Sequence, residues 1–177
     1  MKTFPTEAII AKSGGLGATV FQNTSLKIAP RLQYWLSVDP SPFKLENALV
    51  STQFRFDRIS VDAKSWKQLA GRTFDFPVNP KDGYIDGSVY LFGVHNPADA
   101  TVISFGQQVG KNLPADIMLA IDFAYEGHAE YGVVPLALES SLEIFPLRID
   151  SEIREECGND LGNVSGPISV ASPGRIK

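Results

Sequence analysis

Carboxylate side chains with some of the spacing of a metal-binding loop occur between residues 82 and 93. Asp82, Tyr84 and Asp86 alternate along the chain there. An EF-hand calcium loop requires oxygen ligands at its first, third and fifth positions and a glutamate at its twelfth. Counted from Asp82, the third position is a tyrosine and the twelfth is Gly93, so two of these ligands are missing. We therefore predict no metal ion at this stretch.

Turn chemistry explains the same region more simply. Three dipeptides of turn-forming residues lie in it or beside it: Asn79-Pro80, Asp82-Gly83 and Asn96-Pro97. Asparagine, aspartate and proline favour turns, and glycine adopts a positive φ without strain. We expect a hairpin with residues 87–94 and 101–106 as its two arms, joined by a turn that starts at the third dipeptide.

Nucleophilic catalysis finds little support in the sequence. The chain contains no G-x-S-x-G motif, and the only cysteine, Cys157, follows Glu155 and Glu156, whose charges disfavour a reactive thiolate. His95 and His128 are the only histidines, and we favour surface or hydrogen-bonded roles for them over a metal site. A Ser-His-Asp triad can be assembled from residues far apart in a chain, so a hydrolase with such a site is an alternative.

The glycine-rich stretch at residues 8–20, AIIAKSGGLGATV, invites comparison with nucleotide-binding loops. The dinucleotide motif needs a third small residue after G-x-G, but Gly15-x-Gly17 leads to Val20. A phosphate-binding loop would need Gly-Lys followed by Ser or Thr, which does not occur here. We predict a glycine turn or flexible loop, and no cofactor.

The elements that would position any site are best defined near the end of the chain. Residues 116–126 alternate apolar and polar side chains with period two, and residues 134–145 keep the same period. This pattern predicts a long antiparallel hairpin with one face in the core. Four carboxylates lie on its outward face: Asp122, Glu126, Glu139 and Glu143. A pair such as Asp122 and Glu139 could in principle cleave glycosides, but we interpret these groups as solvated charges.

The loop that joins the two strands, residues 126–132, is the candidate recognition site. It offers Glu126, His128, Glu130 and Tyr131 together on a rigid support. Tyrosine and charged groups on such loops are common in protein recognition. A hairpin loop without a binding role is the alternative interpretation.

Further strands are predicted upstream, with one irregularity. Phe54 and Phe56 share one parity and Ile59 the other, so we expect a β-bulge near Asp57–Arg58 that restores the facing. Residues 64–71 predict a short helical turn, residues 72–78 a strand, and residues 150–158 a short helix.

These elements predict an all-β, mainly antiparallel fold: a β-sandwich of two sheets with one or two short helices. A single domain is expected over residues 1–157, of which residues 1–20 could be loosely ordered. Residues 158–177 are expected to form a flexible tail or an edge strand.

Charge is distributed unevenly along the 177 residues. Residues 113–160 contain 11 acidic and 2 basic side chains, a net charge of −9, whereas the whole chain has −4. An acidic stretch repels phosphates, so we expect no nucleic-acid partner. With no secretory signal, no membrane-spanning run and a single cysteine, we expect a cytoplasmic location and no membrane partner.

The sequence therefore predicts a non-catalytic binding protein whose acidic face and loop engage a basic protein partner. A bacterial immunity or inhibitor protein that blocks a basic toxin fits these features. A structural subunit of a phage or secretion-type assembly, with contacts between copies of the chain, is the principal alternative. We predict no cofactor, no metal and no catalytic residue.

Overall fold

The computed structural model describes residues 2–23, 25–145 and 147. Most of this part of the chain is β-strand, with two short helices. Its elements in chain order are η1 (Thr6–Ala8), β1 (Ala11–Asn23), β2 (Ile28–Pro40), β3 (Phe43–Leu45), β4 (Ala48–Val50), β5 (Phe54–Ile59), α1 (Trp66–Leu69), β6 (Thr73–Asp75), β7 (Asp86–Leu91), β8 (Val94–Phe105), β9 (Asn112–Asp122) and β10 (Val133–Ile144). None of the helices in the described part is long and apolar enough to cross a bilayer.

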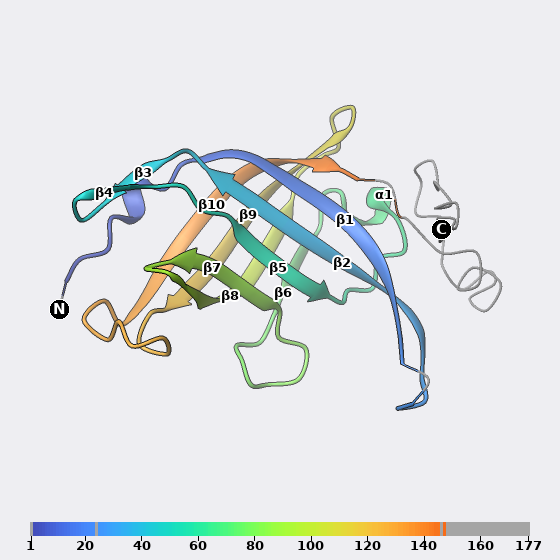
Figure 1. Cartoon of the computed structure of the whole chain (residues 1–177). Coiled ribbons are helices and arrows are strands. Elements are labelled where there is room, and N and C mark those ends of the chain that lie inside the picture. Colours follow the sequence, from blue (N-terminus) through green and yellow to red (C-terminus); the bar gives the residue numbers. More distant parts are fainter. Residues whose placement is uncertain (1, 24, 146, 148–177) are drawn as a thin grey trace, which may run out of the picture.

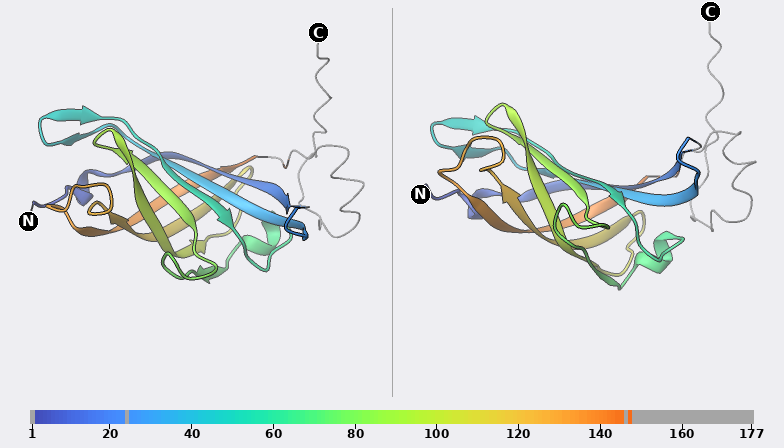
Figure 2. Two further views of the ribbon diagram at one scale, coloured as in Figure 1. Left: turned by 60° about the horizontal axis from the view of Figure 1, so that its bottom comes forward. Right: turned by 90° about the horizontal axis from the view of Figure 1, so that it is seen from below.

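Seven of the strands form a closed barrel (Figure 1). Its order is β8–β7–β5–β2–β1–β10–β9, and β9 pairs again with β8. The β1–β10 pairing is parallel, and the other pairings are antiparallel. Strand β6 adds to the edge of β8, while β3 and β4 form a separate hairpin at the end of the barrel where the chain starts (Figure 2).

The expected sandwich of two sheets is therefore wrong, although the all-β class is right. Alternating side chains show that one face of each strand is buried, but they do not show whether the sheet stays open or closes. Closure here depends on the twelve-residue strand β8, which pairs with β7 through its first residues and with β9 through residues 98–105. A closed barrel leaves few unpaired strand edges.

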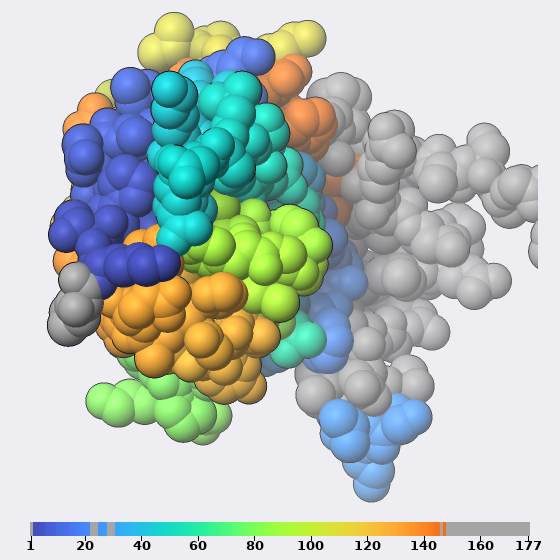
Figure 3. All heavy atoms as spheres, turned by 60° about the vertical axis from the view of Figure 1, so that its left-hand side comes forward, coloured from blue at the N-terminus to red at the C-terminus, as the bar shows by residue number. Residues whose placement is uncertain are grey.

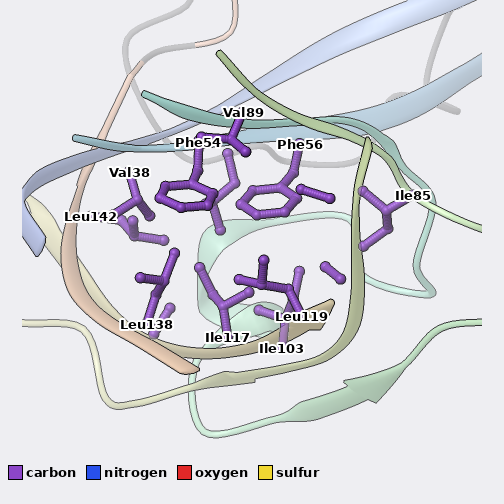
Figure 4. Packing of buried hydrophobic residues seen from close by; sticks show 14 of the residues in the cluster. Val38, Phe54, Phe56, Ile85, Val89, Ile103, Ile117, Leu119, Leu138 and Leu142 are labelled. Atoms are coloured by element: carbon purple, nitrogen blue, oxygen red, sulfur yellow. The ribbon is translucent and has the colours of Figure 1, made fainter. Parts of the chain in front are cut away.

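Apolar side chains from all around the barrel fill its interior (Figure 4). Phe54 and Phe56 of β5 face Ile117 and Leu119 of β9 across this core, with Leu138 of β10 beside them. The predicted hairpin is confirmed as β9–β10, with Leu119 opposite Leu136 in the antiparallel register. Tyr125 was expected to face the core as the last residue of the inward series. Strand β9 instead ends at Asp122, and Tyr125 is 75% exposed.

The glycines of residues 8–20 lie inside strand β1, not in a turn or flexible loop. Gly15 and Gly17 are buried where neighbouring side chains cross the strand. A Cβ on Gly17 would lie 2.1 Å from the indole of Trp35, and one on Gly15 would lie 2.9 Å from the ring of Phe145. These glycines therefore make room for packing, and residues 11–20 are an ordered part of the barrel.

The bulge predicted in β5 is confirmed. Ile59 pairs with Tyr34 and Phe56 with Leu36, so β5 has one residue more than β2 across this step. Arg58 adopts a φ of +60° there. As a result Phe54, Phe56 and Ile59 all reach the core despite their different parity.

The hairpin around residue 95 differs from the expected one. Strands β7 and β8 are joined by Phe92 and Gly93, both with positive φ, and Asn96 and Pro97 lie inside β8. Asn96 is fully buried, and its amide nitrogen donates to the carbonyl oxygen of Leu91 at 3.0 Å. The asparagine therefore stabilises the turn from within the strand. The dipeptides Asn79-Pro80 and Asp82-Gly83 do lie in turns.

The predicted helical turn is confirmed as α1. Ser65 caps it by accepting a hydrogen bond from the Gln68 backbone nitrogen, and Gly71 follows with a φ of +72°. The strand expected at residues 72–78 is the shorter β6. The helix expected at 150–158 and the tail at 158–177 lie outside the described residues.

Candidate functional site

The loop at residues 126–132 covers one end of the barrel. Seen from that end, it meets the N-terminal residues, the β3–β4 hairpin and the β7–β8 turn (Figure 3). Tyr131 is only 4% exposed, and its ring lies against Phe4, Phe92 and Phe123 with centroid distances of 5.3–5.9 Å. The expectation of an accessible tyrosine in this loop is therefore wrong for Tyr131.

Polar contacts hold the same loop to the start of the chain. The hydroxyl of Tyr131 donates to Glu46 Oε1 at 3.0 Å, and Lys2 Nζ donates to the same oxygen at 2.6 Å. Lys2 Nζ also lies 3.8 Å from Glu130. The hydrogen bond from Lys2 lowers the pKa of the Glu46 carboxyl, and the same bond raises the pKa of Lys2.

His128 and Glu126 complete the expected set in this loop. The His128 ring stacks on Phe92 with centroids 4.5 Å apart, and both His128 and Glu126 are half-buried. Burial raises the pKa of the Tyr131 hydroxyl, with a further contribution from its hydrogen bond to Glu46. His128, Glu130 and Tyr131 therefore contact the N-terminal residues, the β3–β4 hairpin and the β7–β8 turn, and these contacts hold the loop against the end of the barrel.

Three of the four carboxylates predicted for the outward face of the β9–β10 hairpin lie on it, whereas Glu126 lies in the turn beyond the end of β9. Glu139 and Glu143 are exposed, and Asp122 is half-buried at the end of β9. Asp116 of β9 lies directly opposite Glu139 of β10. Directly opposite residues on one face bring their Cβ atoms to about 5 Å, where two like charges are destabilising.

No cation of the described residues neutralises this pair. The ion pairs in the described part of the chain join Lys2 to Glu46 and Glu130, Arg55 to Asp57, and Arg58 to Asp86. None of them includes a carboxylate of the β9–β10 outer face. This surface therefore presents two directly opposed carboxylates that form no ion pair with the described residues.

Strand β8 extends the acidic face with a further carboxylate, Asp99, whose register partner on β9 is Ala120. Beside it lies a pocket of about 340 Å³ between the loop after β6 and the strands β8 to β10. Its lining residues are Val78, Asn79, Pro80, Pro97, Asp99, Ala120, Asp122, Tyr125 and Val133. The pocket thus combines two carboxylates with apolar and aromatic walls.

Each of the two carboxylates uses one oxygen within the fold. Asp122 Oδ1 accepts hydrogen bonds from the backbone nitrogens of Ala124 and Tyr125 at 3.0 and 3.2 Å. Asp99 Oδ2 accepts one from the Asn79 nitrogen at 3.2 Å. Burial raises the pKa of the Asp99 carboxyl, the Asn79 hydrogen bond opposes this, and the charge of Asp122 raises it further.

The histidines do not assemble a metal or catalytic cluster in the described residues. His95 is exposed and packs edge-on against Tyr90 with centroids 5.0 Å apart, and His128 lies on Phe92. Within residues 2–23, 25–145 and 147, no group of three or more His, Cys, Asp or Glu side chains could hold a metal ion.

Sequence reasoning missed Asp99 and Asp116 as members of this surface. Asp99 lies on the outer face of β8, whereas the turn expected to start at Asn96-Pro97 would place it in a loop. Asp116 has the same parity as Asp122, so the period of the strand itself could have identified it.

Comparison with protein-family models, with curated proteins and with solved structures found no match for this chain.

Proposed function

We propose that this protein is a non-catalytic binding protein that engages a basic protein partner through the outer face of β8, β9 and β10. The observation that carries the proposal is the opposed pair Asp116 and Glu139, which forms no ion pair within the described part of the chain. A partner that brings lysine or arginine side chains would relieve this repulsion on binding.

Apolar side chains between the charges support the same surface. Met118 lies between Asp116 and Asp122 on the outward side of β9 and is 49% exposed. Val133 and Tyr125, at the Asp122 end, are 63% and 75% exposed. Stable protein interfaces combine an apolar centre with a polar rim, and this face has both parts.

A cytoplasmic inhibitor of a basic enzyme or toxin, as in an immunity protein, is the role that we propose for such a surface. Charge complementarity of this kind accelerates association and selects against acidic partners. The proposed interface keeps Asp122, Glu139 and Glu143 from the residues expected from the sequence, and adds Asp99 and Asp116. Tyr131 is left out because it is buried.

Affinity capture followed by a charge test examines this proposal. The protein is immobilised on a resin and incubated at low salt with a lysate of its source organism. The captured basic protein is then identified and produced recombinantly. Its affinity is then measured by calorimetry for the native chain and for Asp116→Asn/Glu139→Gln. We expect the double substitution to weaken binding by about tenfold, and less at high salt because screening reduces these interactions.

A matched double variant controls for net charge. Glu7 and Asp62 are exposed carboxylates outside the β8–β10 face, and Glu7→Gln/Asp62→Asn removes the same two charges. This control should bind as the native chain does. Equal weakening in both double variants, no weakening in either, or capture of no basic protein would contradict the proposal.

A further inference from the structure

We propose that the pocket at Asp99 and Asp122 receives an arginine side chain of the partner. This inference rests on the proposed function, and it gives the acidic face a specific anchor. The pocket lies at the end of that face where β9 reaches Asp122, and the loop after β6 supplies its remaining wall through Val78, Asn79 and Pro80. Interfaces commonly concentrate their binding energy in such filled pockets.

The walls of the pocket fit the apolar stem of a long cationic side chain. Val78, Val133 and the ring of Tyr125 belong to the large apolar side chains that remain exposed in the described structure, at 48%, 63% and 75%. All three line this one pocket. Lysine and arginine bury their methylene groups against such surfaces while their charged heads reach a polar group. A guanidinium also stacks on aromatic rings.

The two carboxylates fit the charged head. Asp122 Oδ1 and Asp99 Oδ2 accept backbone hydrogen bonds, and the second oxygen of each carboxylate accepts no hydrogen bond from the described residues. A planar guanidinium offers five N–H donors and can bind two acceptors at once, whereas an ammonium is a compact point charge. Two separate carboxylate oxygens therefore favour arginine over lysine.

The local electrostatics favour the same occupant. Asp99 is half-buried and lies close enough to Asp122 for the two charges to interact. A guanidinium bound between the two carboxylates would offset both charges. A hard divalent cation fits less well, because it needs six or more oxygen ligands and the pocket is mainly apolar.

Titration with a small probe tests the pocket without the partner. N-acetyl-arginine-N-methylamide is added to 15N-labelled protein, and the amide resonances are followed. We expect saturable shifts at the amides of Val78, Asn79, Ala98 and Asp99 and of residues 120–125. We expect none with the neutral citrulline analogue, which has nearly the same shape. Shifts of equal size with citrulline, or shifts spread over the whole acidic face, would overturn the proposal.

Substitutions then localise the site. Asp99→Asn/Asp122→Asn should abolish the arginine-specific shifts, while Asp116→Asn/Glu139→Gln, on the same face but outside the pocket, should retain them. A dispersed spectrum of each variant shows that it is folded. If the pocket variant still responds to the arginine probe as the native chain does, the assignment is wrong.

Binding of the captured partner separates this inference from the proposed function. Asp99→Asn/Asp122→Asn should lower the affinity of the partner by about tenfold or more, because a desolvated charge contact is lost. If Asp116→Asn/Glu139→Gln weakens the partner and the pocket variant does not, the function stands and the pocket inference fails. If the arginine amide binds but neither double variant weakens binding of the partner, the proposed function is rejected. The inference that the pocket receives an arginine of that partner is then rejected as well.

Discussion

The indole of Trp35 occupies the space into which a side chain at position 17 would project. Gly17 and Trp35 are register partners on β1 and β2, and a Cβ on Gly17 would lie 2.1 Å from ring atom Cε2. The ring also stacks on Phe145 with centroids 5.7 Å apart and has the Arg55 guanidinium 4.5 Å from its centroid. The glycine therefore allows an aromatic cluster to form on the outside of the barrel.

Gly17→Ala should lower the free energy of unfolding by about 1–3 kcal/mol, because the added methyl group forces Trp35 or the strand to move. Urea denaturation followed by circular dichroism measures the change. In the background of Trp35→Ala the same substitution should cost much less, since the obstructing ring is gone. Thr19→Ala on the exposed part of β1 is the control, and an effect of Gly17→Ala no larger than this control would contradict the prediction.

Tyr34 should make the barrel sensitive to alkaline pH. Its hydroxyl is buried and donates to the Ala63 carbonyl oxygen at 2.8 Å, and burial raises the pKa of Tyr34 to about 12 from an ordinary 10.0. Because the folded pKa is the higher one, the contribution of Tyr34 to stability is fully present below pH 10. This contribution is lost as the pH rises to 12, which lowers the free energy of unfolding by on the order of 2–3 kcal/mol.

Tyr34→Phe should therefore reduce the loss of stability between pH 10 and 12, measured by urea denaturation at each pH. At neutral pH the variant should be less stable by about 1 kcal/mol, because the Ala63 carbonyl loses its donor. The exposed Tyr125→Phe is the matched control and should follow the native curve. Identical alkaline behaviour of Tyr34→Phe and the native chain would show that this hydroxyl does not govern the transition.

Asp116→Asn should stabilise the free protein. Asp116 lies opposite Glu139. Removing one of two opposed like charges is expected to raise the free energy of unfolding by about 0.2–1 kcal/mol. The gain should decrease as salt is added, since screening weakens the repulsion in the native chain. Asp62→Asn, which changes the same type of side chain elsewhere on the surface, provides the comparison. A loss of stability in Asp116→Asn would mean that the pair is not repulsive.

The sequence predicted an element well where the alternation of apolar and polar residues within a single strand was sufficient to identify it. The alternation from Ile117 to Ile121 identified β9, and the change of parity between Phe56 and Ile59 located the bulge. Barrel closure was not predictable in this way, because it depends on pairing between strands that are far apart in the chain. The same limit applies to Gly17, whose role is visible only once Trp35 is placed beside it.

The candidate site was predictable only in part. The outward carboxylates Glu139 and Glu143 follow directly from the strand period, since a buried face leaves its alternate residues outside. The position of Asp99 beside Asp122 depends on the β8–β9 pairing and on the cover from the loop after β6. Tyr131 was misplaced because nothing in the sequence of its loop indicates Phe4 and Phe92 as neighbours.

The parallel pairing of β1 with β10 has a consequence for how the molecule is made. Gly15, one of the first residues of the barrel, finds its neighbour only when Glu143 has been synthesised. Until that residue leaves the ribosome, β1 keeps one side of its backbone unpaired, and open strand edges of this kind promote aggregation of nascent chains. The barrel should therefore be completed only after β10 has been synthesised, and chaperones that shield unpaired strands should improve the yield.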